Sequence, residues 1–300
     1  MDSISYRLEM IGCILANNSA GLDGGVLSAA MSTGVTGVAL FTDSSFLSND
    51  AAGYGGVLFV MNSSPSFAEN ALLLNVSGSK FDGNSALYGS ALYLSDGVGA
   101  NVESSMFSDN FGGCIYSAGS STLLRMTASV ATNNDAVGSS GAVISLGAFK
   151  SVVIENCTFQ SNTAHIGGAV WLSGTGDTVV ITKSIFEDNA ADEGGAVVIE
   201  GWSITGLVSV TSSVFARNNV ARKTSSGIGG ALVLDHLQHA NISGSIFENN
   251  IAKLGSAIFS SSSTSATYIT GDFLSCFLAV FNCSLLVTYL YRIFAYPLGY

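Results

Sequence analysis

The chain has 300 residues, of which 48% are hydrophobic and only 10% are charged, so it has ample material for a core and is not a disordered polar tract. Its net charge is −11 and its 10 Lys and Arg residues are scattered, which excludes nucleic acid as a partner because phosphate binding needs clustered basic side chains. The five cysteines are odd in number and form no Cys-x-x-Cys pair, so we predict neither a zinc cage nor a dense disulfide framework.

The N-terminus reads Met-Asp-Ser-Ile-Ser-Tyr-Arg and lacks the basic start and apolar stretch of a signal peptide. A repeated motif begins almost at once. Its first element has the form Phe-x-x-Asn, with Ile14 and Val130 in the aromatic place of two copies. The aromatic positions lie 23 to 35 residues apart, a period typical of solenoids. The seven phenylalanines are Phe46, Phe81, Phe107, Phe159, Phe186, Phe215 and Phe247, and the nine asparagines are Asn17, Asn49, Asn84, Asn110, Asn133, Asn162, Asn189, Asn218 and Asn250.

A second element, Gly-Gly followed by a small or aliphatic residue, comes after most copies of the first. Between the two elements and after the glycines lie short runs rich in Val, Ile, Leu, Phe and Thr, bounded by Gly, Ser, Asn or Asp. These runs favour three short strands per repeat, and no helical period extends over ten residues. One such unit cannot bury its own apolar face, but stacked copies can, so we expect an all-β parallel β-helix of about nine coils over residues 1–265.

Stacking in register turns each repeated position into a column along the solenoid, with neighbouring strands ~4.8 Å apart. We expect the phenylalanines to form an internal row and the asparagines to form a hydrogen-bonded ladder between coils. The paired glycines supply the positive φ that a sharp bend needs. A leucine-rich repeat is the nearest rival, but it would place Leu-x-x-Leu-x-Leu before the Asn, where this chain has Ser-x-Phe-x-x-Asn.

Residues 266–300 form an apolar C-terminal segment that departs from the repeat. Within it, residues 273–291 contain no charge, and a stretch of this length is enough to cross a bilayer. Polar residues such as Asn282 dilute the stretch, however, and no Lys/Arg cluster marks a cytoplasmic side. We interpret the segment as either a membrane span or a hydrophobic cap, and the first would associate the chain with a membrane.

The combination of Phe-x-x-Asn with Gly-Gly-Ala-Val resembles the repeats of the polymorphic outer membrane protein family. The copies at 159–162 with 167–170 and at 186–189 with 194–197 carry the match, which covers about residues 10 to 260. The resemblance implies a right-handed β-helix displayed at the cell surface or outside the cell as an adhesin. The chain has no barrel-length domain at its C-terminal end, in contrast to that family's pattern.

Parallel β-helices also include polysaccharide lyases and hydrolases, for which paired carboxylates on the outward columns would be the sign. Glu103 and Glu155 lie two coils apart with Met126 expected between them, roughly 10 Å at ~4.8 Å per coil and slightly beyond the ~6.5–9.5 Å of an inverting glycosidase. Asp188, Asp192 and Glu193 form the one dense acidic group, which we interpret as a hydrated turn.

Other candidates are weaker. His236 and His239 lack a third placed ligand, and no phosphate-loop, nucleophile-elbow or zinc-protease motif occurs, so no catalytic, cofactor or metal site is predicted. The turn between Asn218 and Gly229 carries a basic insertion with Arg222 and Lys223, which we predict as the partner-binding loop. Sequons at Asn62, Asn75, Asn156 and Asn241 are glycosylation sites if the chain enters a eukaryotic secretory route.

Periodicity without a local chemical constellation favours a non-enzymatic β-helix at the cell surface or outside the cell. It would act as an adhesin-like protein that binds proteins or glycans, or as a rigid spacer. The alternative is a polysaccharide lyase or glycoside hydrolase on the same scaffold. The sequence does not indicate the oligomeric state.

Overall fold

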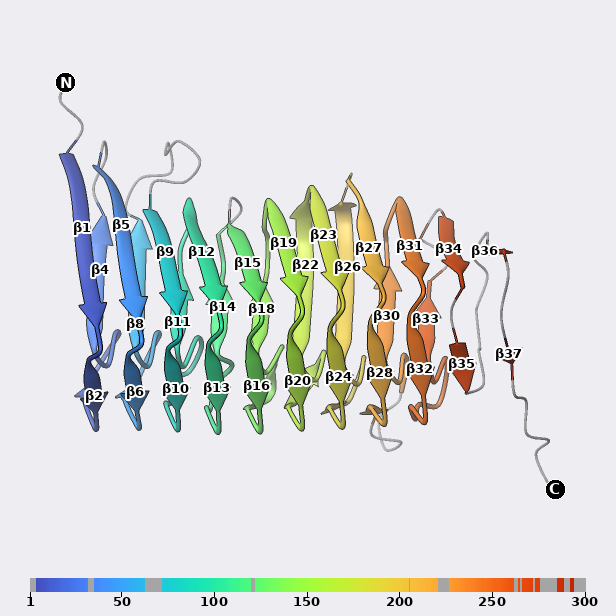
Figure 1. The fold of residues 1–300 in the computed structure, drawn as a ribbon, viewed down its shortest axis with the longest axis horizontal. Helices are drawn as coiled ribbons and strands as arrows, with labels where there is room; N and C mark the ends of the chain where they lie inside the picture. The colour runs from blue at the N-terminus through green and yellow to red at the C-terminus, as the bar shows by residue number, and fades with distance from the viewer. Residues whose placement is uncertain are drawn as a thin grey trace.

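The structure is a computed structural model that describes residues 4–31, 35–62, 72–119, 122–204, 206–220, 227–261, 264, 266–271, 273–275, 285–288 and 292–293. Within these ranges the chain is all-β and has no helix. The strands belong mainly to three long parallel sheets that run side by side along one axis, and each of the first nine turns of the chain contributes one strand to each sheet (Figure 1). The predicted fold class, a parallel β-helix, is confirmed.

Each of the three sheets follows the solenoid axis, and its strands succeed one another in spatial order. The first sheet contains β1 (Ile4–Ile11), β5 (Val35–Thr42), β9 (Leu72–Ser77), β12 (Val98–Glu103), β15 (Leu123–Thr127), β19 (Ser151–Glu155), β23 (Thr178–Thr182), β27 (Val208–Thr211), β31 (His239–Ser243), β34 (Ala266–Thr270) and β36 (Leu285–Thr288). The second sheet contains β2 (Ile14–Ala16), β6 (Ser45–Leu47), β10 (Lys80–Asp82), β13 (Met106–Ser108), β16 (Val130–Thr132), β20 (Thr158–Gln160), β24 (Ile185–Glu187), β28 (Val214–Ala216), β32 (Ile246–Glu248), β35 (Phe273–Ser275) and β37 (Arg292–Ile293). The third sheet contains β4 (Leu27–Met31), β8 (Leu58–Asn62), β11 (Leu92–Leu94), β14 (Ile115–Ser117), β18 (Ile144–Leu146), β22 (Val170–Gly176), β26 (Val197–Ile204), β30 (Leu232–Asp235) and β33 (Ile258–Ser260).

Two short ladders line the bend between the second and third sheets. One contains β17 (Asp135–Ser140), β21 (Thr163–Ile166), β25 (Ala190–Ala191) and β29 (Asn219–Val220), and the other contains β3 (Ser19–Ala20) and β7 (Asp50–Ala51). Side chains alternate between the interior and the outer surface along most strands, as the burial of β9 and β19 shows. The core is therefore one continuous apolar column enclosed by the three sheets.

The bends on either side of the second sheet are both made by a single residue with a left-handed backbone conformation. The residue just before each ladder Asn has a left-handed backbone, with φ between 53° and 64°. At the bend that precedes the second sheet, the residue two places before each strand behaves in the same way, with φ between 48° and 61° from Gly12 to Gly244. A single left-handed residue turns the chain sharply and directs the next side chain inward.

The seven phenylalanines occupy one interior row, and Ala131 interrupts it once. Neighbouring rings stack with centroids 4.7 to 4.9 Å apart and planes within 14° of parallel. The prediction that Ile14 and Val130 continue this row is wrong. Leu15 pairs with Phe46, and Ala131 pairs with Phe107 and Phe159, whereas Ile14 is 76% exposed and Val130 is 38% exposed on the outer surface.

The asparagine ladder runs through nine residues, but two of them differ from the prediction. Each side-chain Nδ2 donates to the Oδ1 of the next Asn over 2.8 to 3.0 Å. Asn18 and Asn134 hold the places predicted for Asn17 and Asn133. These two precede the ladder residue and take the left-handed conformation instead, each with φ of 57°. Both errors come from Asn-Asn pairs, in which only the second residue points inward.

A second polar row, which we did not predict from the sequence, lies at the bend between the first and second sheets. Its members are Cys13, Ser44, Ser79, Ser105, Ser129, Cys157, Ser184, Ser213 and Ser245. In seven of the steps along it, the backbone N–H of one coil donates to the serine Oγ of the next over 3.1 to 3.2 Å. This row, which we call the serine row, and the asparagine ladder satisfy buried backbone groups at the bends, where the sheet ladders are broken.

The two glycines of a pair are required for different reasons. The first of each pair has positive φ, for example 61° at Gly194. The second is needed because the coils approach closely: a Cβ on Gly168 would lie 2.2 Å from the carbonyl oxygen of Gly195, and a Cβ on Gly195 would lie 2.2 Å from that of Gly230.

The first two sheets continue into the apolar C-terminal segment. The strand β34 pairs in register with β31, and β35 pairs with β32. Residues 276–284, 289–291 and 294–300 of the predicted membrane span or cap lie outside the described residues. No helix among the described residues is long and apolar enough to cross a membrane.

Candidate functional site

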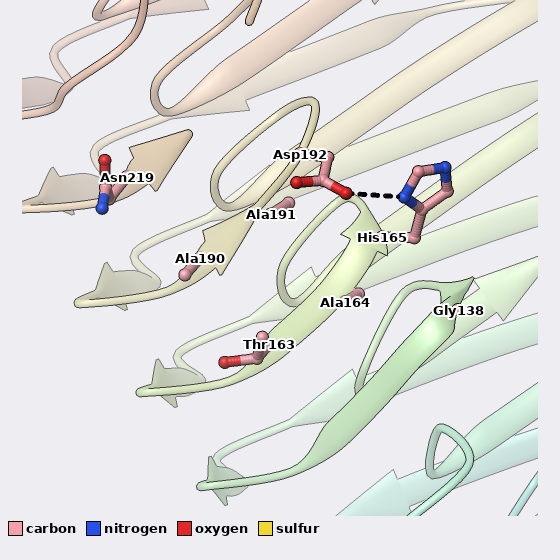
Figure 2. Close-up of a pocket in the computed structure, with 8 residues that line it drawn as sticks. All are labelled: Gly138, Thr163, Ala164, His165, Ala190, Ala191, Asp192 and Asn219. Atoms are coloured by element: carbon pink, nitrogen blue, oxygen red, sulfur yellow. Dashed lines mark hydrogen bonds and ion pairs between the residues drawn. The ribbon is translucent and has the colours of Figure 1, made fainter. Parts of the chain in front are cut away.

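A shallow pocket lies on the outside of the short ladder β17-β21-β25-β29, where backbone and small side chains leave room (Figure 2). Its polar side is formed by His165, at the end region of β21, and by Asp192, which follows β25. The Nδ1 of His165 lies 2.9 Å from Oδ2 of Asp192. The lining is completed by Gly138, Thr163, Ala164, Ala190, Ala191 and Asn219.

A histidine oriented by a carboxylate is a component of many hydrolases, because the carboxylate fixes the ring and stabilises its charged form. The lining of this pocket, however, contains a single hydroxyl, that of Thr163, and no second carboxylate. Both partners are also well exposed, with 54% and 39% of their side chains accessible. This pair therefore has the character of a surface ion pair between two coils.

The predicted carboxylate pair, Glu103 and Glu155, lines one open depression on the outer face of the first sheet. Thr127, not Met126, lies between them, because Glu103 pairs with Thr127 and Thr127 pairs with Glu155. Met126 is fully buried. The prediction was displaced by one residue for the same reason as the Asn133 assignment, since both belong to one coil. Arg125 lines the depression as well and donates from Nη2 to Oε2 of Glu155 over 3.0 Å.

A cluster of five aromatic residues covers part of the outer face of the third sheet. Phe59, Tyr93 and Tyr116 are direct register partners on β8, β11 and β14. Tyr54 and Tyr88 flank them from the neighbouring bend, where they form an isolated bridge. Ring centroids lie 4.8 to 6.3 Å apart throughout the cluster. We refer to Tyr54, Phe59, Tyr88, Tyr93 and Tyr116 as the aromatic cluster.

The hydroxyls of Tyr93 and Tyr116, two members of the aromatic cluster, are held in the neutral form. Burial raises the pKa of Tyr93 and Tyr116, and neighbouring phenols raise it further. Neutral phenols act as both hydrogen-bond donors and acceptors. The sequence gives a signal for this cluster, because tyrosines recur at the Gly-Gly element in consecutive copies, but we did not predict it.

Farther along the same face, three carboxylates lie near one another, and one of them is bonded to Trp171. Its indole Nε1 donates to Oε1 of Glu200 over 2.9 Å. Glu200 pairs in register with Asp235, and Glu193 lies at the adjoining bend. Burial raises the pKa of Glu193, and the nearby charges of Glu200 and Asp235 add to this, while His165 acts in the opposite direction. We refer to Glu193, Glu200 and Asp235 as the acidic cluster.

The acidic residues of the turn at 188–193 do not form one cluster, because each contacts a different neighbour. Asp188 pairs with Arg217 of the next coil over 2.9 Å, Asp192 pairs with His165, and Glu193 belongs to the third sheet's face. Arg217 also contacts Glu187. Among the described residues, no three His, Cys, Asp or Glu side chains come together as a metal site requires.

The remaining predicted site residues are the two histidines, the sequon asparagines and the basic loop. His236 pairs with Asp235 over 2.9 Å, and His239 is exposed at the start of β31. Asn75 and Asn241 are part-exposed and Asn156 is exposed, while nothing is described of the Asn62 side chain, so glycosylation stays a prediction. Arg222 and Lys223 lie outside the described residues, and their role as a partner loop stays a prediction too.

The register, the interior rows and the three parallel sheets together define a parallel β-solenoid. A family model described as the right handed beta helix region matches residues 69–221, slightly more than half of the chain. The chain therefore belongs to the right-handed β-helix family. No curated protein and no solved structure is similar enough to be matched. The finer resemblance to polymorphic outer membrane protein repeats stays a prediction.

Proposed function

We propose that this chain is a non-enzymatic, adhesin-like β-helix that works at a cell surface or outside the cell. Its recognition surface is the outer face of the third sheet. The aromatic cluster is the observation that carries this proposal. The asparagine ladder, the serine row and the phenylalanine row recur in almost every coil and are explained by stacking, whereas the aromatic cluster occupies only three consecutive coils.

Grouped aromatic side chains on an outer surface are a mark of an interaction site. Tyrosine and tryptophan are enriched at protein interfaces because they combine a large apolar area with a polar group and lose little conformational entropy. Four of the five members are part-exposed tyrosines, so the cluster offers both kinds of contact. A fold-stabilising role alone would not require it, because the core is already continuous beneath the sheet.

Binding of the whole chain to arrayed peptides and glycans tests this proposal. The double variant Tyr93→Ser/Tyr116→Ser should lose most binding to whichever class the wild-type chain retains. The control Ile185→Ser/Ile246→Ser removes two side chains, 40% and 39% exposed, from the second sheet and should bind as the wild type does. Equal binding by both double variants would contradict the proposal.

A carbohydrate-active enzyme is the second candidate, because Glu103, Arg125 and Glu155 line one depression. The carboxylate of Glu155 is paired with Arg125, whose Nη2 lies 3.0 Å from Oε2. Release of reducing or unsaturated ends from neutral and acidic polysaccharides, abolished by Glu155→Gln, would establish this function in place of the first.

A further inference from the structure

The third sheet differs from the other two in charge. Its nine strands contain two acidic residues, Glu200 and Asp235, and no Lys or Arg. Strands of the first sheet carry Arg7 and Arg125, and a strand of the second carries Lys80. The strands of the third sheet are therefore aromatic and acidic on their outer face, and they lack the cations that pair with carboxylates on the other two sheets.

The orientation of the rings limits what can bind to the aromatic cluster. Phe59, Tyr93 and Tyr116 lie over one another along the solenoid axis, with centroids 5.0 and 5.4 Å apart and interplanar angles of 32° and 21°. Their faces are consequently turned toward each other, which leaves the edges of the part-exposed Tyr93 and Tyr116 rings on the outer surface, whereas Phe59 is buried. Ligands that stack, such as bases and sugar rings, need an exposed ring face. Exposed edges and hydroxyls suit a polypeptide, whose backbone offers hydrogen-bond donors and acceptors.

The acidic cluster complements a cationic partner. Its three carboxylates repel one another, and the raised pKa of Glu193 reflects this repulsion together with burial. Two histidines bring positive charge to the cluster when their rings are protonated. His165 acts on Glu193, and His236 pairs with Asp235. A guanidinium or ammonium group placed among these carboxylates would relieve the repulsion and gain charge-assisted hydrogen bonds.

The two clusters lie on the same face of the sheet, although Glu200 and Asp235 are displaced by two residues along their strands from the register column of Phe59, Tyr93 and Tyr116. From β8 to β30 the sheet advances by six strand steps, through β11, β14, β18, β22 and β26. At ~4.8 Å per step this spans about 29 Å, the length of an extended segment of about nine residues. Trp171 lies between the clusters, on β22.

We propose that the outer face of the third sheet docks an extended polypeptide segment rich in Arg or Lys, with its basic side chains on the acidic cluster and its backbone along the aromatic cluster. This inference rests on the proposed function, whose recognition surface it assigns to a partner class. Alternate residues of an extended segment face the same side, so a basic residue at every second position presents all its charges to the sheet.

Fluorescence anisotropy with a labelled 12-residue peptide of alternating Arg and Ser tests the docking directly. Glu193→Gln/Glu200→Gln should weaken binding by about tenfold or more, as expected for loss of close charge pairs. The control Glu103→Gln/Glu155→Gln makes the same change of net charge on the first sheet and should alter the affinity less than about twofold. The Tyr93→Ser/Tyr116→Ser variant should also bind more weakly, whereas an alternating Glu and Ser peptide should not bind.

The affinity should fall as the pH is lowered, because protonation of Glu193 removes a charge that the partner needs. Equal losses in the two Glu→Gln pairs would overturn the inference, since binding would then reflect only the overall charge of −11. Failure to bind the basic peptide, together with glycan binding that depends on Tyr93 and Tyr116, would overturn the inference and leave the proposed function intact. Failure with every peptide and glycan would overturn both.

Discussion

Each coil makes two of its bends with a pair of residues in which the first has positive φ and the second points inward. The inward residue is Ser or Cys at one bend and Asn at the other, and the difference follows from what each bend must satisfy. A hydroxyl accepts one backbone N–H from the preceding coil and donates to the carbonyl two residues before it, as Ser79 does to Ser77. Both kinds of side chain also reach a carbonyl of the preceding coil, as Ser79 does at Phe41 and Asn84 does at Phe46, but only the amide bonds the next ladder residue through its side chain, as Asn84 does with Asn110.

Cys157 shows that a thiol can replace a hydroxyl in the serine row. It occupies a serine place, and its Sγ lies 3.3 Å from the carbonyl oxygen of Glu155 and 3.4 Å from that of Met126. The N–H of Ser129 donates to it. Burial raises the pKa of the Cys157 thiol to about 11. Because the folded-state pKa lies above the unfolded value, this thiol favours the folded state below about pH 9 and loses that contribution as the pH rises toward 11.

We therefore expect Cys157 to resist alkylation at about pH 8 in the native chain and to react after unfolding, as peptide mass mapping can show. Cys157→Ser should fold with stability within about 1 kcal/mol of the wild type, because the hydroxyl replaces the sulfur in the same contacts. Cys157→Ala should lose about 1–3 kcal/mol, because it leaves the Ser129 N–H buried without an acceptor. Rapid native-state alkylation would contradict the burial of this thiol.

Residue-level prediction from the sequence succeeded where a single inward Asn or Phe occurs in a copy, as at Phe186 and Asn189. It failed at Asn17–Asn18 and Asn133–Asn134, two Asn-Asn pairs in copies without a Phe, whereas the Asn-Asn pairs that follow Phe215 and Phe247 were assigned correctly. At Asn133 and Asn134 the sequence offers two equal candidates, and only the backbone conformation distinguishes them. This copy has Ala131 in place of the row's Phe, so the sequence lacks the aromatic residue whose spacing to the Asn would have resolved the choice.

At the scale of strands, the phenylalanine row links neighbouring coils through an almost unbroken stack of rings. Phe186 stacks between Phe159 and Phe215 at 4.7 and 4.8 Å and is fully buried. Replacement by Ala would remove both ring contacts and leave a cavity in a close-packed core. Since each coil in a solenoid contacts only its neighbours, the damage should be centred on β20, β24 and β28.

Phe186→Ala should lower the free energy of unfolding by about 3–5 kcal/mol in urea denaturation. Ile185→Ala is the matched control, because the adjacent side chain points outward and is 40% exposed, and it should cost less than about 1 kcal/mol. Hydrogen exchange in the Phe186→Ala variant should accelerate most in strands β20, β24 and β28. Equal costs for the two variants would mean that the interior and outer faces of β24 are assigned wrongly.

Across the whole molecule, the stacking rule explains the interior, while the outer surface varies from face to face. Period and strand type could be predicted because every coil repeats the same inward residues. We did not predict the third sheet's face, because its tyrosines and carboxylates occur in only some coils. The tyrosines beside the Gly-Gly element gave a signal, but these side chains become neighbours only after the coils stack. The His165–Asp192 pair is another example, since its members lie 27 residues apart in sequence.

The acidic cluster should reduce stability at neutral pH. The folded-state pKa of Glu193 is raised above its ordinary value of 4.5, so ionisation favours the unfolded chain and stability falls as the pH rises through that value. Glu193→Gln should therefore raise the melting temperature at about pH 7, and the difference should shrink below about pH 4. Glu248→Gln, which makes the same charge change on the second sheet, serves as the control. A lower melting temperature for Glu193→Gln at neutral pH would contradict the repulsion within the acidic cluster.

The register places equivalent side chains of successive coils directly over one another, with Asn134 in the ladder and Asn133 outside it. Urea denaturation of Asn133→Gly and Asn134→Gly tests it with one substitution at two adjacent positions. Asn134→Gly should cost about 3 kcal/mol or more, because it leaves Asn110, Asn162 and the carbonyl of Phe107 without their partner. Asn133→Gly should change stability by less than about 1 kcal/mol, because glycine adopts the positive φ of that position readily. A larger loss at Asn133 than at Asn134 would contradict the register on which the whole account depends.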